Sequence, residues 1–151
     1  MQLAEALIQR VDLQKRLREL EKRLERVCTA QEGDQPAENP QNLIHEIDQC
    51  YRELEGLICC INKTNSAAMD NDISLADLLC RRDMLQKKHT LLRNIAQSGT
   101  ISQSRYSARE VRYVSTVNVM ELQQQADACA REYRDLDTRI QRLNWTTALL
   151  E

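Results

Sequence analysis

Arg82 and His89 carry side chains that can do chemistry, yet they lie where the sequence pattern calls for apolar residues. They follow Leu75 and precede Ala96 at steps of seven residues, so all four share one face of an expected helix. A guanidinium on a core-facing stripe is costly unless an acidic group pairs with it. The candidate partners are Asp48, Glu55 and Asp137. Two interpretations follow: an internal polar network that fixes helix register, or a ligand or catalytic site built on Arg82.

A second set of polar side chains lies at the ends of expected helices. If four helices run alternately up and down, the end of the second, the start of the third and the end of the fourth meet at one pole. This pole would collect Asn62, Thr64, Asn65, Asp77, Asn144, Trp145 and Thr146. Such groups beside an aromatic ring can bind a small polar ligand, but they also cap helix ends. The predicted ligand-binding residues are Asn62, Thr64, Asn65, Arg82, Asn144 and Trp145, with capping as the alternative.

The cysteines do not follow the spacing of a metal or redox site. There are six: Cys28, Cys50, Cys59, Cys60, Cys80 and Cys129. None is paired at the C-x₂-C spacing of a zinc site, and only His45 and His89 could act as imidazole ligands. The vicinal pair Cys59-Cys60 would suit a soft thiophilic metal or a strained disulfide. We expect instead that Cys50 and Cys129 are small core residues and that the protein holds no metal or cofactor.

No familiar catalytic motif occurs in the chain. It has no G-x-G-x-x-G, P-loop, H-E-x-x-H or nucleophile elbow, which favours a protein that is not an enzyme and has no catalytic residues. A cysteine–histidine nucleophile pair is left open. Basic and aromatic residues alternate at Arg105, Tyr106, Arg109, Arg112 and Tyr113, as in some nucleic-acid binders, but Glu110 interrupts them. We expect no nucleic-acid partner.

Four long segments position these residues, because apolar side chains recur in them at helical spacing. The expected helices span about 3–28, 40–63, 74–98 and 118–147. With only three Gly and two Pro in 151 residues, an all-β fold is excluded. The predicted fold is all-α: four long antiparallel helices in a single helical-bundle domain over 1–151. The second helix has an extra apolar row, Ile44, Tyr51 and Ile58, so we expect it in the middle of the bundle.

The stretch 105–117 does not read as helix. Its β-branched and aromatic residues predict a short strand or hairpin before the last helix. A lone strand cannot pair its own backbone groups, so we expect it to pair in a hairpin or with another subunit. The predicted oligomer interface is Arg112, Tyr113 and Val114, in a homo-oligomer.

The charge distribution and the amino-terminal sequence indicate where the protein is located and which partners it could bind. The formal net charge is −2, which gives no field for nucleic acid or membrane over the chain as a whole. Residues 28–73 carry seven more acidic than basic groups, whereas residues 74–98 carry three more basic than acidic ones. That contrast indicates complementary helix flanks or an acidic docking face. No secretory signal or apolar span is evident, so a cytoplasmic protein is expected and membrane association is not.

Several short motifs together resemble the septicolysin-like family, small bacterial proteins of undetermined function. These are MQLAEALI at 1–8, DLQ at 12–14, QEGD at 31–34, INKTN at 61–65, RD at 82–83, RYS at 105–107, YVSTV at 113–117, LDTRIQ at 136–141 and NW at 144–145. The family name implies a pore-forming cytolysin, for which a lipid-facing segment would be needed. We expect instead a non-enzymatic helical protein that self-associates and binds a partner or small ligand, with the cytolysin as the alternative.

Overall fold

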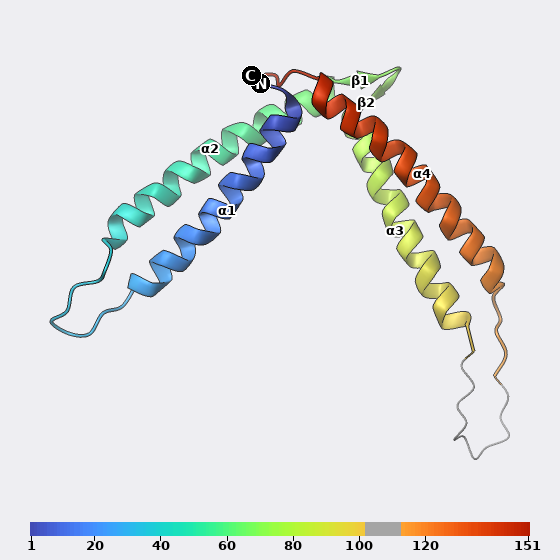
Figure 1. The fold of residues 1–151 in the computed structure, drawn as a ribbon, viewed down its shortest axis with the longest axis horizontal. Helices are drawn as coiled ribbons and strands as arrows, with labels where there is room; N and C mark the ends of the chain where they lie inside the picture. The colour runs from blue at the N-terminus through green and yellow to red at the C-terminus, as the bar shows by residue number, and fades with distance from the viewer. Residues whose placement is uncertain (102–112) are drawn as a thin grey trace, which may run out of the picture. The chain divides into compact units, whose positions relative to one another are not determined.

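Four helices make up most of the chain in a computed structural model that describes residues 1–101 and 113–151. They are α1 (Leu3–Val27), α2 (Pro40–Ala67), α3 (Leu75–Gly99) and α4 (Val119–Thr146), shown in Figure 1. The all-α prediction is confirmed, and the helix ends agree with the predicted ones to within a few residues. The contacts divide the chain into two compact units, Met1–Leu75 with Gln141–Glu151, and Ala76–Ile140.

In the first unit, α1 and α2 pack along the leucine-lined seams that the sequence predicts. Leu20, Val27, Leu43 and Cys50 are buried in one cluster. Partly buried side chains surround it: Leu17, Leu24 and Ile47. Steps of three and four residues keep these side chains on one face of each helix, which is the geometry of a coiled-coil seam. Cys50 is the small core residue that was expected there, and Cys129 is likewise buried on α4.

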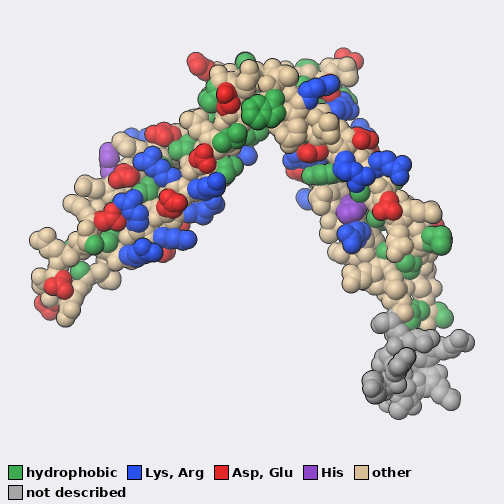
Figure 2. All heavy atoms as spheres, viewed as in Figure 1, with side chains coloured by type: hydrophobic (Ala, Val, Ile, Leu, Met, Phe, Trp, Pro, Cys, Tyr) green, Lys and Arg blue, Asp and Glu red, His purple; other side chains and the backbone are tan. Residues whose placement is uncertain are grey.

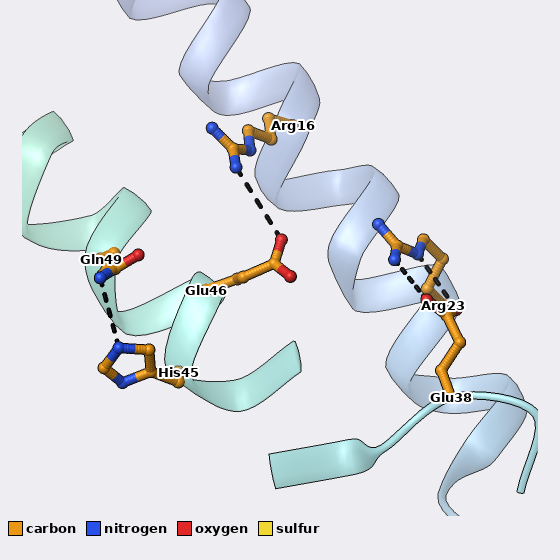
Figure 3. Close-up of polar contacts among 6 residues, drawn as sticks. All are labelled: Arg16, Arg23, Glu38, His45, Glu46 and Gln49. Carbon is orange, nitrogen blue, oxygen red and sulfur yellow. Dashed lines mark hydrogen bonds and ion pairs between the residues drawn. The ribbon is translucent and has the colours of Figure 1, made fainter. Parts of the chain in front are cut away.

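Ion pairs join the other faces of α1 and α2 (Figure 3). The Arg16 guanidinium lies 3.8 Å from a Glu46 carboxylate oxygen. Arg23 holds Glu38 with two nitrogens, and its Nε lies 3.1 Å from Glu38 Oε2. Because residues 16 and 23 meet residues 46 and 38 in reverse order, the helices run antiparallel. Glu38 precedes α2, so this contact fixes where the chain returns to α1.

The Arg23–Glu38 pair has a measurable consequence for titration. The hydrogen bond from Arg23 lowers the pKa of Glu38 below its ordinary value, and the guanidinium charge adds to this. We expect the side-chain carboxyl resonance of Glu38 to titrate at a lower pH than that of an isolated glutamate, measured by NMR. In Arg23→Met the midpoint should return to the ordinary value, whereas Arg18→Met, on the same helix, should leave it unchanged. A low midpoint that survives Arg23→Met would contradict this assignment.

Asparagine side chains cap the starts of α2 and α4. Asn39 caps α2 through Oδ1, which accepts a hydrogen bond from the Gln41 amide at 2.9 Å, and Pro40 occupies the first turn. Asn118 caps α4 in the same way, accepting from the Glu121 amide at 3.1 Å. These caps explain why α2 and α4 begin where they do.

The β structure differs in position from the prediction. A two-stranded antiparallel hairpin joins α2 to α3, with β1 (Met69–Asp70) and β2 (Ile73–Ser74) paired in the register Met69↔Ser74 and Asp70↔Ile73. Asn71 at the turn has φ 56°, a conformation that Asn tolerates better than most residues. The predicted strand at 105–117 is wrong for 113–117, which form no strand. Residues 105–112 lie outside the described residues.

In the second unit, α3 and α4 form another antiparallel pair. Arg81 on α3 is paired with Glu132 on α4. Farther along, the end of α3 approaches the start of α4, because a Cβ added at Gly99 would lie 2.6 Å from Val117 Cγ2. A side chain at residue 99 would therefore require the Val117 side chain to shift. Core-facing residues include Leu78, Ala96, Ala126, Cys129 and Leu136.

A membrane-spanning helix needs sufficient length and hydropathy to cross the bilayer. Within residues 1–101 and 113–151, we find no helix whose length and apolar character would let it cross a bilayer.

Candidate functional site

The structure divides the predicted ligand-binding residues between the two units. Asn62, Thr64, Asn65, Asn144 and Trp145 belong to the first unit, and Arg82 belongs to the second. Asn62 is exposed and Asn65 half-buried, whereas Thr64 and Asn144 are buried.

Thr64 is held in a structural role. Its side chain is fully buried, and its hydroxyl donates to the Cys60 carbonyl oxygen at 2.8 Å. The same hydroxyl oxygen accepts a hydrogen bond from the Leu150 amide at 2.9 Å. Thr64 thus ties residue 150 to α2, a structural role that differs from both ligand binding and the capping that the sequence left open.

Arg82 lies in a polar network within the second unit. Its Nη1 lies 3.1 Å from Asp137 Oδ1, and its Nη2 lies 3.4 Å from Asp83 Oδ1. Asp137 was one of the three expected partners. The contact fits the interpretation that a paired guanidinium fixes the register of α3 against α4. His89, one heptad later, is half-buried and lines a polar hollow with Thr90, Arg93 and Gln123.

The two ends of the chain come together in the first unit and position a groove. The Leu3 amide donates to the Thr147 carbonyl at 2.9 Å, and the Leu149 amide donates to the Met1 carbonyl at 2.9 Å. Gln2 and Ala148 form an antiparallel bridge between these bonds. This pairing places the first turns of α1 beside the last turns of α4 (Figure 1).

The groove has a volume of about 390 Å³, within the size range of small-molecule sites. Its apolar wall on α1 is formed by Ala4, Leu7, Ile8 and Val11. The α4 side is formed by Gln141, Asn144 and Trp145. Trp145 is 57% exposed and Ile8 is 55% exposed, so the groove lining includes two large apolar side chains that are open to solvent. Figure 2 shows hydrophobic side chains exposed in this part of the first unit.

Arg10 gives the groove its charge and was missed by sequence reasoning. The Nε of Arg10 is buried and has no hydrogen-bond partner among the described residues. A buried donor left unpaired costs about 1–3 kcal/mol. The signal was present in the sequence, because Arg10 lies seven residues after Leu3 and seven before Leu17, the same placement that singled out Arg82. Lys15 adds a second positive charge at the groove and Asp12 a negative one.

The described residues of the predicted oligomer interface and the cysteines lie outside the groove. Tyr113 and Val114 of the predicted oligomer interface are exposed, and Val114 lines a shallow hollow with Ile95 and Val117. Arg112 lies outside the described residues. All six cysteines are free, and among residues 1–101 and 113–151 no three histidine, cysteine or acidic side chains are grouped as a metal site.

Residues 1–101 and 113–151 thus form an all-α protein with a small amphipathic groove beside the first turns of α1. The chain belongs to DUF6847, a family of unknown function, whose model matches residues 10–149. It is also similar to a functionally unknown conserved protein from Corynebacterium diphtheriae, known from a crystal structure. That protein is 46% identical, the TM-score is 0.92, and the match covers 99% of each chain. A search of curated proteins gives no match. The resemblance to septicolysin-like proteins, and pore formation with it, stays a prediction.

Proposed function

We propose that this protein is a non-enzymatic binding protein whose groove between α1 and α4 holds an organic anion with an apolar body. The observation that carries the proposal is the unpaired, buried Nε of Arg10 beside the exposed Trp145 ring. A rotation of the Arg10 side chain toward the groove would give its guanidinium an anionic oxygen as acceptor, and charge-assisted bonds of this kind are stronger than neutral ones. Leu7, Ile8 and Val11 offer apolar surface for the rest of the ligand.

The groove favours an amphipathic ligand over a purely polar one. Its wall on α1 is mostly aliphatic, and Trp145 supplies a flat ring with a single N–H donor. Burial of aliphatic surface provides most of the affinity in such sites, while a few polar groups fix orientation. A carboxylate at one end of an alkyl chain combines both properties.

Titration with octanoate and with octanol tests this proposal, because the two probes share an alkyl chain and differ in charge. Trp145 is the only tryptophan, so its fluorescence reports on the groove alone. We expect saturable quenching by octanoate with at least tenfold tighter binding than octanol. Arg10→Met should remove this preference, since about 1.5–3 kcal/mol is typical for a hydrogen bond to a charged group.

Arg18→Met is the matched control, because Arg18 is an exposed arginine on the same helix outside the groove. It should bind both probes as the unchanged chain does. Circular dichroism of each variant checks that the helices are intact. Equal affinity for octanoate and octanol, or a preference for octanoate that survives Arg10→Met, would overturn the proposal.

A further inference from the structure

Helix α2 has a second apolar row that α1 does not cover. Ile44, Tyr51 and Ile58 follow one another at steps of seven residues, about 100° around the helix from the seam that faces α1. Tyr51 is 58% exposed and Ile44 is 39% exposed. Within the first unit, the packing of α1 on α2 therefore leaves this row open to solvent. A helix with two apolar rows needs a second neighbour to remove the outer row from water.

Helix α3 has a comparable row on the side away from α4. Met84 and Leu91 are seven residues apart, and Ile95 lies on the same face one turn later. Leu91 is 59% exposed and Met84 is 50% exposed. The inner side of α3, with Leu78 and Ala96, is buried in the second unit. Large apolar side chains in a row at helical spacing are typical of a helix contact.

The two rows differ in the charges beside them. Asp48 and Glu55 each follow a member of the α2 row by four residues, so they lie on its face and are exposed. Lys87 and Lys88 lie beside the α3 row, between Met84 and Leu91, and are exposed. The same contrast holds over longer stretches, since 28–73 is acidic and 74–98 is basic.

We infer that these rows form an interface between two copies of this chain. The acid-flanked α2 row of one copy packs against the lysine-flanked α3 row of the other, and the reciprocal contact closes a two-fold dimer. A shared step of seven residues lets the two rows interdigitate. Like rows are kept apart, because two α2 rows would oppose carboxylates and two α3 rows would oppose ammonium groups.

The reciprocal arrangement also suits the size of the rows. A stable interface buries roughly 1,600 Å² in total, so each of the two equivalent contacts has to supply only about half of that. None of these residues lines the groove with Trp145, so the inference goes beyond the proposed function and stands apart from it. It places self-association at residues different from the predicted Arg112, Tyr113 and Val114.

Charge reversal on the full chain tests the interface. In Asp48→Lys/Glu55→Lys both rows become basic, and in Lys87→Glu/Lys88→Glu both become acidic. We expect the unchanged chain to be a dimer by analytical ultracentrifugation, and each variant alone to dissociate at least tenfold more readily. An equimolar mixture of the two variants should restore a dimer with one chain of each kind. A role within a single chain could not be restored by mixing.

Two further variants keep the test decisive. Glu21→Lys/Lys22→Glu changes two exposed charges on α1 outside both rows and should leave the dimer unchanged. Leu91→Gln removes apolar surface without adding charge and should weaken dimerisation at least tenfold, with helix content by circular dichroism unchanged. A monomeric unchanged chain, or a mixture of the charge variants that stays monomeric, would overturn the inference.

Discussion

Leu20→Ala is expected to lower the free energy of unfolding by about 2–5 kcal/mol. Leu20 is only 1% exposed and lies in the buried cluster with Val27, Leu43 and Cys50. Its truncation removes apolar contacts from both α1 and α2 and leaves a cavity between them. The surrounding side chains relax only partly to fill such a cavity. The loss should therefore exceed the transfer energy of the missing side-chain atoms.

Urea unfolding followed by circular dichroism measures this loss, with Ile8→Ala as the control. Ile8 is on the same helix, but it is more than half exposed, so its truncation should change stability by no more than about 0.5 kcal/mol. If Leu20→Ala were as stable as Ile8→Ala, the cluster between α1 and α2 would not be the core of the first unit.

The helices could be predicted because their apolar period is long and regular. In α4, Leu122, Ala126, Cys129 and Leu136 keep one face over several turns, and a long repeat of this kind is compatible only with helix. The caps at Asn39 and Asn118 then fixed the starts, since the carboxamide of each accepts a bond from a first-turn amide. Regular local patterns of this kind do not depend on distant parts of the chain.

The β structure could not be placed in the same way. Two-residue strands are too short to show an alternating pattern, and the hairpin at Met69–Ser74 depends on the left-handed conformation of Asn71. From the sequence, these residues are only the gap between the expected helices 40–63 and 74–98. Conversely, residues 113–117 are rich in β-branched residues, which favour strands, but they form no strand in the structure. A high strand propensity does not by itself supply a second strand to pair with.

The candidate site was predicted in part. Heptad position singled out Arg82 and led to Asp137 as a possible partner, which the structure bears out. Arg10 occupies the same kind of heptad position, between Leu3 and Leu17, so this criterion would also have identified the arginine of the groove. The groove itself needs the pairing of residues 1–3 with 147–149, which uses backbone groups alone. Backbone pairing between distant segments has no side-chain pattern, so the sequence did not indicate which residues of the two chain ends pair.

Thr64→Val is expected to cost about 1–3 kcal/mol of the free energy of unfolding. Valine has nearly the shape of threonine, so the substitution removes the hydroxyl and leaves packing almost unchanged. The Cys60 carbonyl loses one donor, and the Leu150 amide loses an acceptor that belongs to a fully buried side chain. The lost acceptor has the larger cost, because the apolar methyl group of valine takes the place of the hydroxyl and leaves no oxygen for the N–H at that position.

Thr138→Val is the matched control for this effect. The Thr138 hydroxyl also donates to the carbonyl four residues earlier, that of Arg134, but Thr138 is exposed and water can replace the bond. We expect its stability to change by no more than about 0.5 kcal/mol in urea unfolding. Amide exchange of Leu150 should become faster in Thr64→Val and stay unchanged in Thr138→Val. Slow exchange of Leu150 in Thr64→Val would mean that Thr64 does not hold the C-terminal tail, and the α1–α4 side of the groove would then depend on the Met1–Leu3 pairing alone.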